Sequence, residues 1–145
     1  MTRPEATFTS PADPTAVAAY LADPRNLVIA NNKRPIVDQS DDGPTATGSW
    51  YVLKLDQLRL RVEYVAFDPP TRIDVEIVSS GFGSAGYRQR VEYRLAPDST
   101  GTGTTITQEG EGRGGIPILG RLMAGLVRRR MQRRFDSIPP TPPST

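Results

Sequence analysis

The chain has 145 residues, which suits one domain with its own core, and it contains neither cysteine nor histidine. These absences exclude disulfides, thiolate nucleophiles, imidazole bases and the commonest ligands of transition metals. The formal net charge is only +2, so attraction to an anionic partner would have to come from a local cluster of charge. The first residues show neither a basic segment followed by an apolar run nor a long apolar stretch, and we expect a cytoplasmic protein without stable membrane insertion.

The N-terminal part predicts one strand followed by two short helices. Residues 5–10 alternate weakly between polar and apolar side chains, as a strand does. An Asp-Pro pair at 13–14 is typical of a helix start, and a second pair at 23–24 repeats the signal. We expect the second helix over residues 25–30.

From residue 35 onward the apolar period changes to two, which indicates half-buried strands. The clearest segment places Ile73, Val75 and Ile77 on one face, with charged residues between them. In another segment we expect Tyr64 and Ala66 to share the apolar face. Turn-forming residues separate the segments. Together with the first, they make seven expected strands, at residues 5–10, 35–39, 46–55, 58–66, 72–77, 87–95 and 104–109.

One long helix is predicted for residues 116–137, with prolines near its start and after its end. Its apolar residues form a stripe that drifts around the axis, so the helix should lie across a twisted sheet. A cluster of arginines on this helix either meets an anionic partner or forms a solvated face, and we favour the solvated face. The cluster consists of Arg121, Arg128, Arg129, Arg130, Arg133 and Arg134. We expect one domain over residues 1–138 and a disordered, proline-rich tail over 139–145.

Three stretches match ligand-binding motifs in their letters but not in their context. Residues 81–86 read G-x-G-x-x-G, yet a predicted strand follows where a dinucleotide site needs a helix. Residues 38–49 imitate a calcium loop but place Ser49 where a bidentate Glu is required. The glycines within 110–115 lack the Lys-Ser or Lys-Thr of a phosphate loop, so we expect a flexible strand-to-helix corner there. The sequence therefore predicts no metal and no cofactor.

The whole-chain order of elements resembles the helix-grip fold of the START and polyketide cyclase superfamily, also called SRPBCC. The segments that carry the resemblance are residues 10–14 leading into Val17, Tyr20 and Leu21, residues 22–26, 67–70 and 93–97, Gly103-Thr104, and the final helix. It implies an α+β fold in which a seven-stranded curved antiparallel sheet wraps around a long C-terminal helix, with two short helices between strands 1 and 2. It further implies an apolar pocket between sheet and helix, but no particular reaction.

Side chains on the sheet face directed toward the helix are expected to line this pocket, although most would serve equally as core. Gln89 and Gln108 share that face, and a buried amide needs a partner, which is a ligand, the other glutamine or a water. Arg130 lies within the apolar stripe of the final helix, where it meets an anionic ligand group or extends its head into water. The expected ligand-binding residues are Tyr51, Leu53, Val62, Tyr64, Val75, Tyr87, Gln89, Val91, Tyr93, Ile106, Gln108, Met123, Leu126, Val127 and Arg130.

We expect the function to be binding or transport of a small lipophilic molecule, such as a lipid, polyketide or isoprenoid, by a monomer or homodimer that does not bind nucleic acid. The alternative is a polyketide cyclase, aromatase or related lyase, in which Tyr64, Tyr87, Glu109 or Arg130 would act as acid or base. The sequence shows no adjacent pair of an acid and a base, so we assign no catalytic residue. The enzyme is therefore the less favoured hypothesis. A third possibility is an interaction module whose apolar groove receives a partner's segment.

Overall fold

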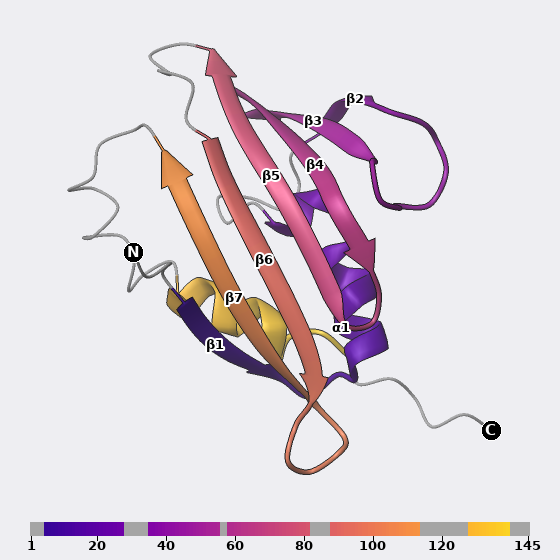
Figure 1. Ribbon diagram of the computed structural model, residues 1–145, viewed down its shortest axis with the longest axis vertical. Helices are drawn as coiled ribbons and strands as arrows, with labels where there is room; N and C mark the ends of the chain where they lie inside the picture. Colours follow the sequence, from indigo (N-terminus) through magenta and orange to yellow (C-terminus); the bar gives the residue numbers. More distant parts are fainter. Residues whose placement is uncertain (1–4, 28–34, 56–57, 82–87, 114–127, 140–145) are drawn as a thin grey trace.

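The computed structural model describes residues 5–27, 35–55, 58–81, 88–113 and 128–139, and Figure 1 shows their arrangement. Its body is a curved, seven-stranded antiparallel sheet in the spatial order β1-β7-β6-β5-β4-β3-β2. The strands are β1 (Glu5–Ser10), β2 (Ile36–Gln39), β3 (Trp50–Leu55), β4 (Leu58–Asp68), β5 (Arg72–Gly81), β6 (Arg88–Pro97) and β7 (Thr104–Arg113). The sheet is thus a meander whose last strand pairs with the first, which confirms the expected strand number and antiparallel pairing.

Two helices follow β1, as the Asp-Pro pairs predict. In α1 (Pro14–Leu21) the Asp13 side chain accepts a hydrogen bond from the Ala16 N–H at 2.8 Å, and Pro14 occupies the first turn. The second helix is a 3-10 helix, η1 (Pro24–Leu27). The remainder of the predicted range, 28–30, lies outside the described residues.

The final helix is seen in part. Residues 128–136 are helical and are called here the C-terminal helical segment, whereas residues 116–127 of the predicted helix and 140–145 of the predicted tail lie outside the described residues. In Figure 1, α1 and this segment lie behind the same side of the sheet, in its lower half. Among the described residues, no helix has the length and apolar character needed to span a bilayer.

The C-terminal helical segment is fixed to β1 by packing and hydrogen bonds. The rings of Phe8 and Phe135 lie 5.3 Å apart between centroids. The Ser10 hydroxyl donates to the Phe135 carbonyl at 2.7 Å, and Gln132 Nε2 donates to the Thr9 carbonyl at 2.8 Å. This partly covers the backbone of an edge strand that would otherwise be free to pair with another chain.

Two strands differ from prediction for reasons of backbone geometry. β3 begins at Trp50 rather than at residue 46, because Gly48 takes a positive φ of 94° and donates its N–H to the Tyr64 carbonyl at 2.8 Å. In β4 a bulge at Val65 shifts the pairing, so that Ala66 lies opposite Asp74 and Phe67 lies opposite Ile73. The expectation that Ala66 continues the apolar face is therefore wrong, and Phe67 takes that place.

β7 is longer than predicted, because it continues to Arg113 in register with β6. Gly110 lies opposite Val91 and Gly112 lies opposite Gln89. The prediction that these two glycines form a strand-to-helix corner is wrong, since glycine weakens a strand but does not prevent pairing where a neighbour supplies the ladder.

Candidate functional site

The inner face of the sheet, defined as the face on which the buried side chains lie and against which α1 packs, holds most of the predicted ligand-binding residues. Buried there are Tyr51, Leu53, Val62, Tyr64, Val75, Val91, Tyr93 and Ile106. Gln89 and Gln108 are half-buried in the same alternation. Tyr87, Met123, Leu126 and Val127 lie outside the described residues.

Two inner-face tyrosines are engaged with the end of α1. The Tyr64 hydroxyl donates to the Leu21 carbonyl at 2.6 Å. Thr45 Oγ1 donates to the Ala22 carbonyl at 2.7 Å and lies 2.8 Å from the Tyr51 hydroxyl oxygen. These side chains satisfy carbonyls that a helix leaves free at its C-terminus. Burial, with Tyr51 as a further cause, raises the pKa of Tyr64 far above its ordinary value. A phenol that is held protonated and already donates to the backbone is badly suited to proton transfer.

A second pair of polar residues on this face is not engaged. Tyr93 on β6 lies directly opposite Gln108 on β7. Burial raises the pKa of Tyr93, and its hydroxyl forms no hydrogen bond within the described part of the chain. Gln108 Oε1 is buried and also lacks a partner there. An unsatisfied buried acceptor costs about 1–3 kcal/mol, so an oxygen in this state is a place where a ligand or water gains free energy by donating to it.

Next to Gln108 on the inner face, β7 offers no side chain. A Cβ placed on Gly110 would lie 3.6 Å from the Arg90 carbonyl oxygen, 3.9 Å from Val91 Cγ2 and 4.0 Å from Gln89 Nε2. Within the described residues, these nearest atoms all belong to β6, so a methyl group would fit without a clash. The sequence signal for this gap is a glycine at an inward position of an amphipathic strand, and the prediction of a corner over residues 110–115 overlooked it.

The two inner-face glutamines stand on either side of this gap. Gln89 and Gln108 form no hydrogen bond with each other among the described residues. The expected alternatives to a ligand were a bond between the two glutamines and a bound water. The bond between the glutamines is not formed in this part of the chain, so the water is the alternative that stays.

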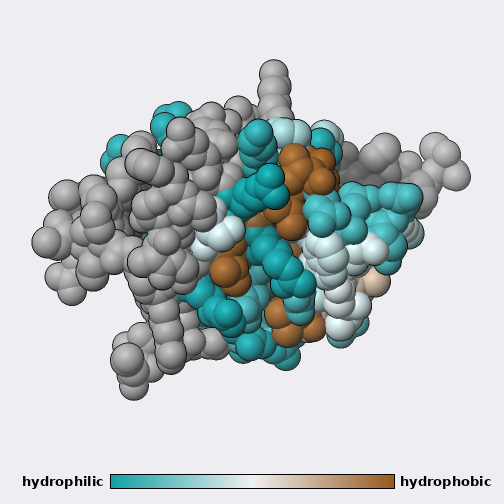
Figure 2. Space-filling view, turned by 90° about the horizontal axis from the view of Figure 1, so that it is seen from above, coloured by the Kyte–Doolittle hydropathy of each residue, from teal (hydrophilic) through white to brown (hydrophobic). Residues whose placement is uncertain are grey.

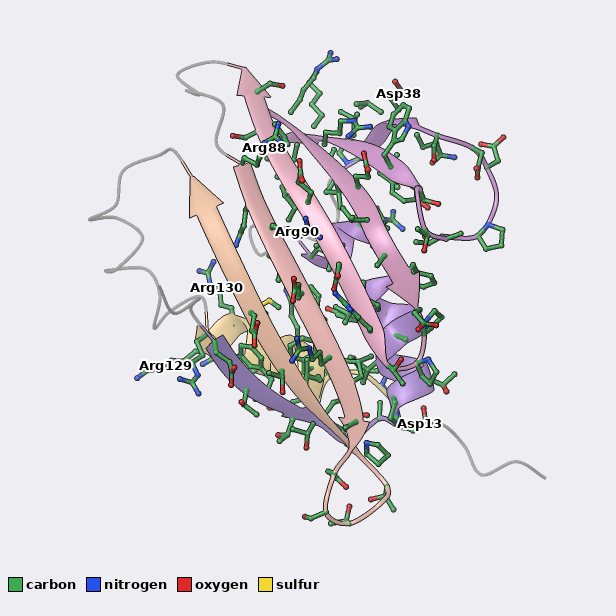
Figure 3. The ribbon with its side chains drawn as sticks, viewed as in Figure 1. Asp13, Asp38, Arg88, Arg90, Arg129 and Arg130 are labelled. Atoms are coloured by element: carbon green, nitrogen blue, oxygen red, sulfur yellow. The ribbon has the colours of Figure 1, made fainter. Side chains whose placement is uncertain are left out.

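The remaining acid and base candidates lie away from the inner face. Glu109 projects from the opposite face of β7, in register between Glu92 and Glu5. Arg130 is exposed on the C-terminal helical segment. In Figure 3 it rises beside β7, whereas Arg129 points away from the sheet beyond β1. An exposed guanidinium fits the reading in which its head reaches water, and a contact with a ligand stays a prediction.

The outer face of the sheet is occupied by ion pairs. Arg72 Nη2 lies 2.7 Å from Asp74 Oδ2, and Arg88 Nη1 lies 2.8 Å from Glu76 Oε1. The Arg61 guanidinium pairs with Glu63 and also covers the Trp50 ring at 5.1 Å. In the described ranges no group of carboxylates is arranged to hold a metal ion. Figure 2, which looks on the molecule from above, shows small apolar areas separated by hydrophilic ones on the described part of that side.

A family model covers nearly the whole sequence. The model described as polyketide cyclase / dehydrase and lipid transport matches residues 1–138. Among curated proteins, no sequence matches this chain at a significant level.

Solved structures share the fold at low sequence identity. Mll3558 from Rhizobium loti is 18% identical with a TM-score of 0.60, over 92% of this chain and 99% of its own. CalU16 from Micromonospora echinospora is 18% identical with a TM-score of 0.56, over 93% of this chain and 74% of its own. DynU16, a protein of the dynemicin biosynthetic locus, is 20% identical with a TM-score of 0.59 over 89% of this chain. The chain spans only 45% of the length of DynU16.

Proposed function

Since the chain belongs to the polyketide cyclase / dehydrase and lipid transport family, we propose that it binds or transports a small lipophilic molecule, such as a lipid, polyketide or isoprenoid, on the inner face of its sheet. The single observation that carries this proposal is the gap at Gly110, where the apolar inner face lacks a side chain beside Val91. Because glycine has no side chain, a flat apolar guest can approach the backbone there more closely than it could at any other residue type.

The driving force is the removal of apolar surface from water. The site has Val75 and Val91 as its apolar wall, both buried on adjacent strands opposite each other. A guest that buries about 200 Å² of apolar surface gains about 5 kcal/mol before the cost of immobilising it, at about 25 cal/mol per Å². We further propose that Arg130 belongs to this site, together with the predicted residues outside the described part of the chain, Tyr87, Met123, Leu126 and Val127.

Binding without turnover is favoured over catalysis by the state of the polar groups. Tyr64 donates to a backbone carbonyl and Glu109 lies on the outer face. Neither can deliver or remove a proton at a guest on the inner face without a rearrangement.

The alternative is a polyketide cyclase or aromatase that uses the same site, and one residue favours it. Tyr93 is buried, and its hydroxyl has no hydrogen bond within the described residues, so it is available to donate a hydrogen bond to a substrate carbonyl and orient it. Turnover of a poly-β-ketone substrate that is lost in Tyr93→Phe but kept in Tyr51→Phe would establish the enzyme.

Native mass spectrometry of the protein purified from its own host tests the proposal. We expect a mass adduct of one small apolar molecule per chain, released into organic solvent and absent after delipidation. Failure to find such an adduct, followed by failure to rebind fatty acids, isoprenoids and aromatic polyketides, would overturn the proposal.

A further inference from the structure

We propose that the guest carries a hydroxyl group on a flat apolar skeleton, as a phenol or enol does, and that this group donates a hydrogen bond to Gln108 Oε1 while the skeleton lies over Gly110. The inference rests on the proposed function and adds the chemical class of the ligand. Three observations on adjacent positions of β1, β6 and β7 carry it.

The first observation is an unmade hydrogen bond at the side-chain oxygen of Gln108. Oε1 is buried and unpartnered within the described part of the chain. In the register, Gln108 lies between Ala6 on β1 and Tyr93 on β6. Ala6 contributes only a methyl group. A ligand hydroxyl therefore supplies the hydrogen bond that Gln108 Oε1 lacks among the described residues.

The second observation concerns Tyr93, directly across from Gln108. Its hydroxyl makes no hydrogen bond in the described residues, although the side chain is only 3% exposed. Opposite residues on antiparallel strands have their Cβ atoms about 5 Å apart. The two side chains thus start side by side on the inner face, and no hydrogen bond joins them among the described residues. A guest hydroxyl placed there can donate to Gln108 and accept from Tyr93.

The third observation fixes where the skeleton lies. Gly110 follows Gln108 on the same face, about 7 Å along the strand. At Gly110 no side chain covers the backbone, and the nearest neighbours of a Cβ there would be the Arg90 carbonyl oxygen, Val91 Cγ2 and Gln89 Nε2. An aromatic or enolic ring of about that length spans the distance from this area to Gln108. A hydrocarbon chain without a hydroxyl group could also lie there, but it would leave Oε1 unsatisfied.

Isothermal titration calorimetry with matched compounds tests the inference. The compounds are 2-naphthol, which has the donor, and 2-methoxynaphthalene, which keeps the skeleton and an acceptor but lacks the donor. For the wild-type protein we expect 2-naphthol to bind about tenfold more tightly, the equivalent of about 1.4 kcal/mol. In Gln108→Met, which keeps the length of the side chain, this preference should fall below about threefold while the ether binds as before.

Two further variants keep the result interpretable. Gln108→Leu replaces Gln108→Met if the latter does not fold, as judged by circular dichroism. Gln39→Leu is the control, because the Gln39 amide donates to Asp42 and lies outside the site; it should keep the full preference for the naphthol.

Different outcomes separate this inference from the proposed function. Equal binding of both compounds to the wild type, a preference for the ether, or an unchanged preference in both Gln108 variants would overturn the hydroxyl assignment and leave lipophilic binding intact. Absence of binding by both compounds, together with the negative mass spectrometry result above, would overturn the proposed function and this inference with it.

Discussion

The Tyr64 hydroxyl donates to the Leu21 carbonyl over 2.6 Å and so joins the middle of β4 to the last residue of α1. The bond is buried, and the two residues are 43 positions apart in the chain. It therefore fixes α1 against the inner face, and it explains why this tyrosine is unsuited to proton transfer.

Tyr64→Phe should reduce the free energy of unfolding by about 1–3 kcal/mol, because it leaves the Leu21 carbonyl buried without a donor. Tyr51→Phe is the matched control. It removes a hydroxyl whose hydrogen-bond partner among the described residues is Thr45, while Thr45 still donates to Ala22, so the loss should be smaller. Urea denaturation at neutral pH measures both. Equal losses in the two variants would show that the bond to Leu21 has no special role.

Substitutions at Gly110 should separate binding from stability. Gly110→Ala adds a methyl group at ordinary contact distances, so it should preserve the fold and weaken the binding of 2-naphthol less than a larger side chain does. Gly110→Leu should weaken binding at least about tenfold, equivalent to about 1.4 kcal/mol, because its side chain occupies the area in which the guest lies. Calorimetry measures affinity and thermal unfolding measures stability. Full affinity in a folded Gly110→Leu variant would place the guest elsewhere.

Asp23 should make stability depend on pH in the acid range. Burial acts to raise the pKa of this carboxyl, but the hydrogen bonds and charge of Arg25, whose Nη2 lies 2.7 Å away, outweigh it and hold the pKa below its ordinary value. A depressed pKa means that the folded state binds the proton less tightly than the unfolded state does. The stabilisation is therefore present above the ordinary Asp pKa of about 3.9 and is lost as the pH falls through the folded value.

Asp23→Asn tests this linkage, since the amide oxygen can still accept from the Arg25 N–H while the charge is gone. Because both side chains are partly exposed, the effect should be modest, about 0.5 kcal/mol. Between pH 7 and about pH 2.5, the wild type should lose that much more unfolding free energy than the variant. A larger loss of unfolding free energy in the variant than in the wild type would show that the pKa of Asp23 is not lowered by folding.

Local patterns were sufficient to predict most elements of the fold. The alternation of Ile73, Asp74 and Val75 identifies β5, and Asp13 with Pro14 identifies the start of α1, because each signal depends on neighbours in the chain. The bulge at Val65 was not predictable, since Tyr64, Val65, Ala66 and Phe67 are all compatible with either face, and only pairing with β5 decides between them.

The site was predicted less completely than the fold, for a related reason. The inward register of Gln89 and Gln108 follows from alternation, and the structure places both on the inner face. However, whether a polar group already forms a hydrogen bond within the protein depends on partners that are distant in the sequence. Tyr64 bonds to Leu21 and Tyr93 has no partner among the described residues, yet both occupy similar apolar strand faces in the sequence.

The most direct measurement of the central claim is a methyl-resolved NMR titration with 2-naphthol. Val75 and Val91 lie on the inner face, whereas Val52 and Val78 lie in register with Arg61 on the outer face. We predict saturable shifts at the methyl groups of Val75 and Val91, at one compound per chain, with Val52 and Val78 unchanged. Shifts confined to Val52 and Val78, or no saturable shift at any of the four, would contradict a lipophilic guest on the inner face.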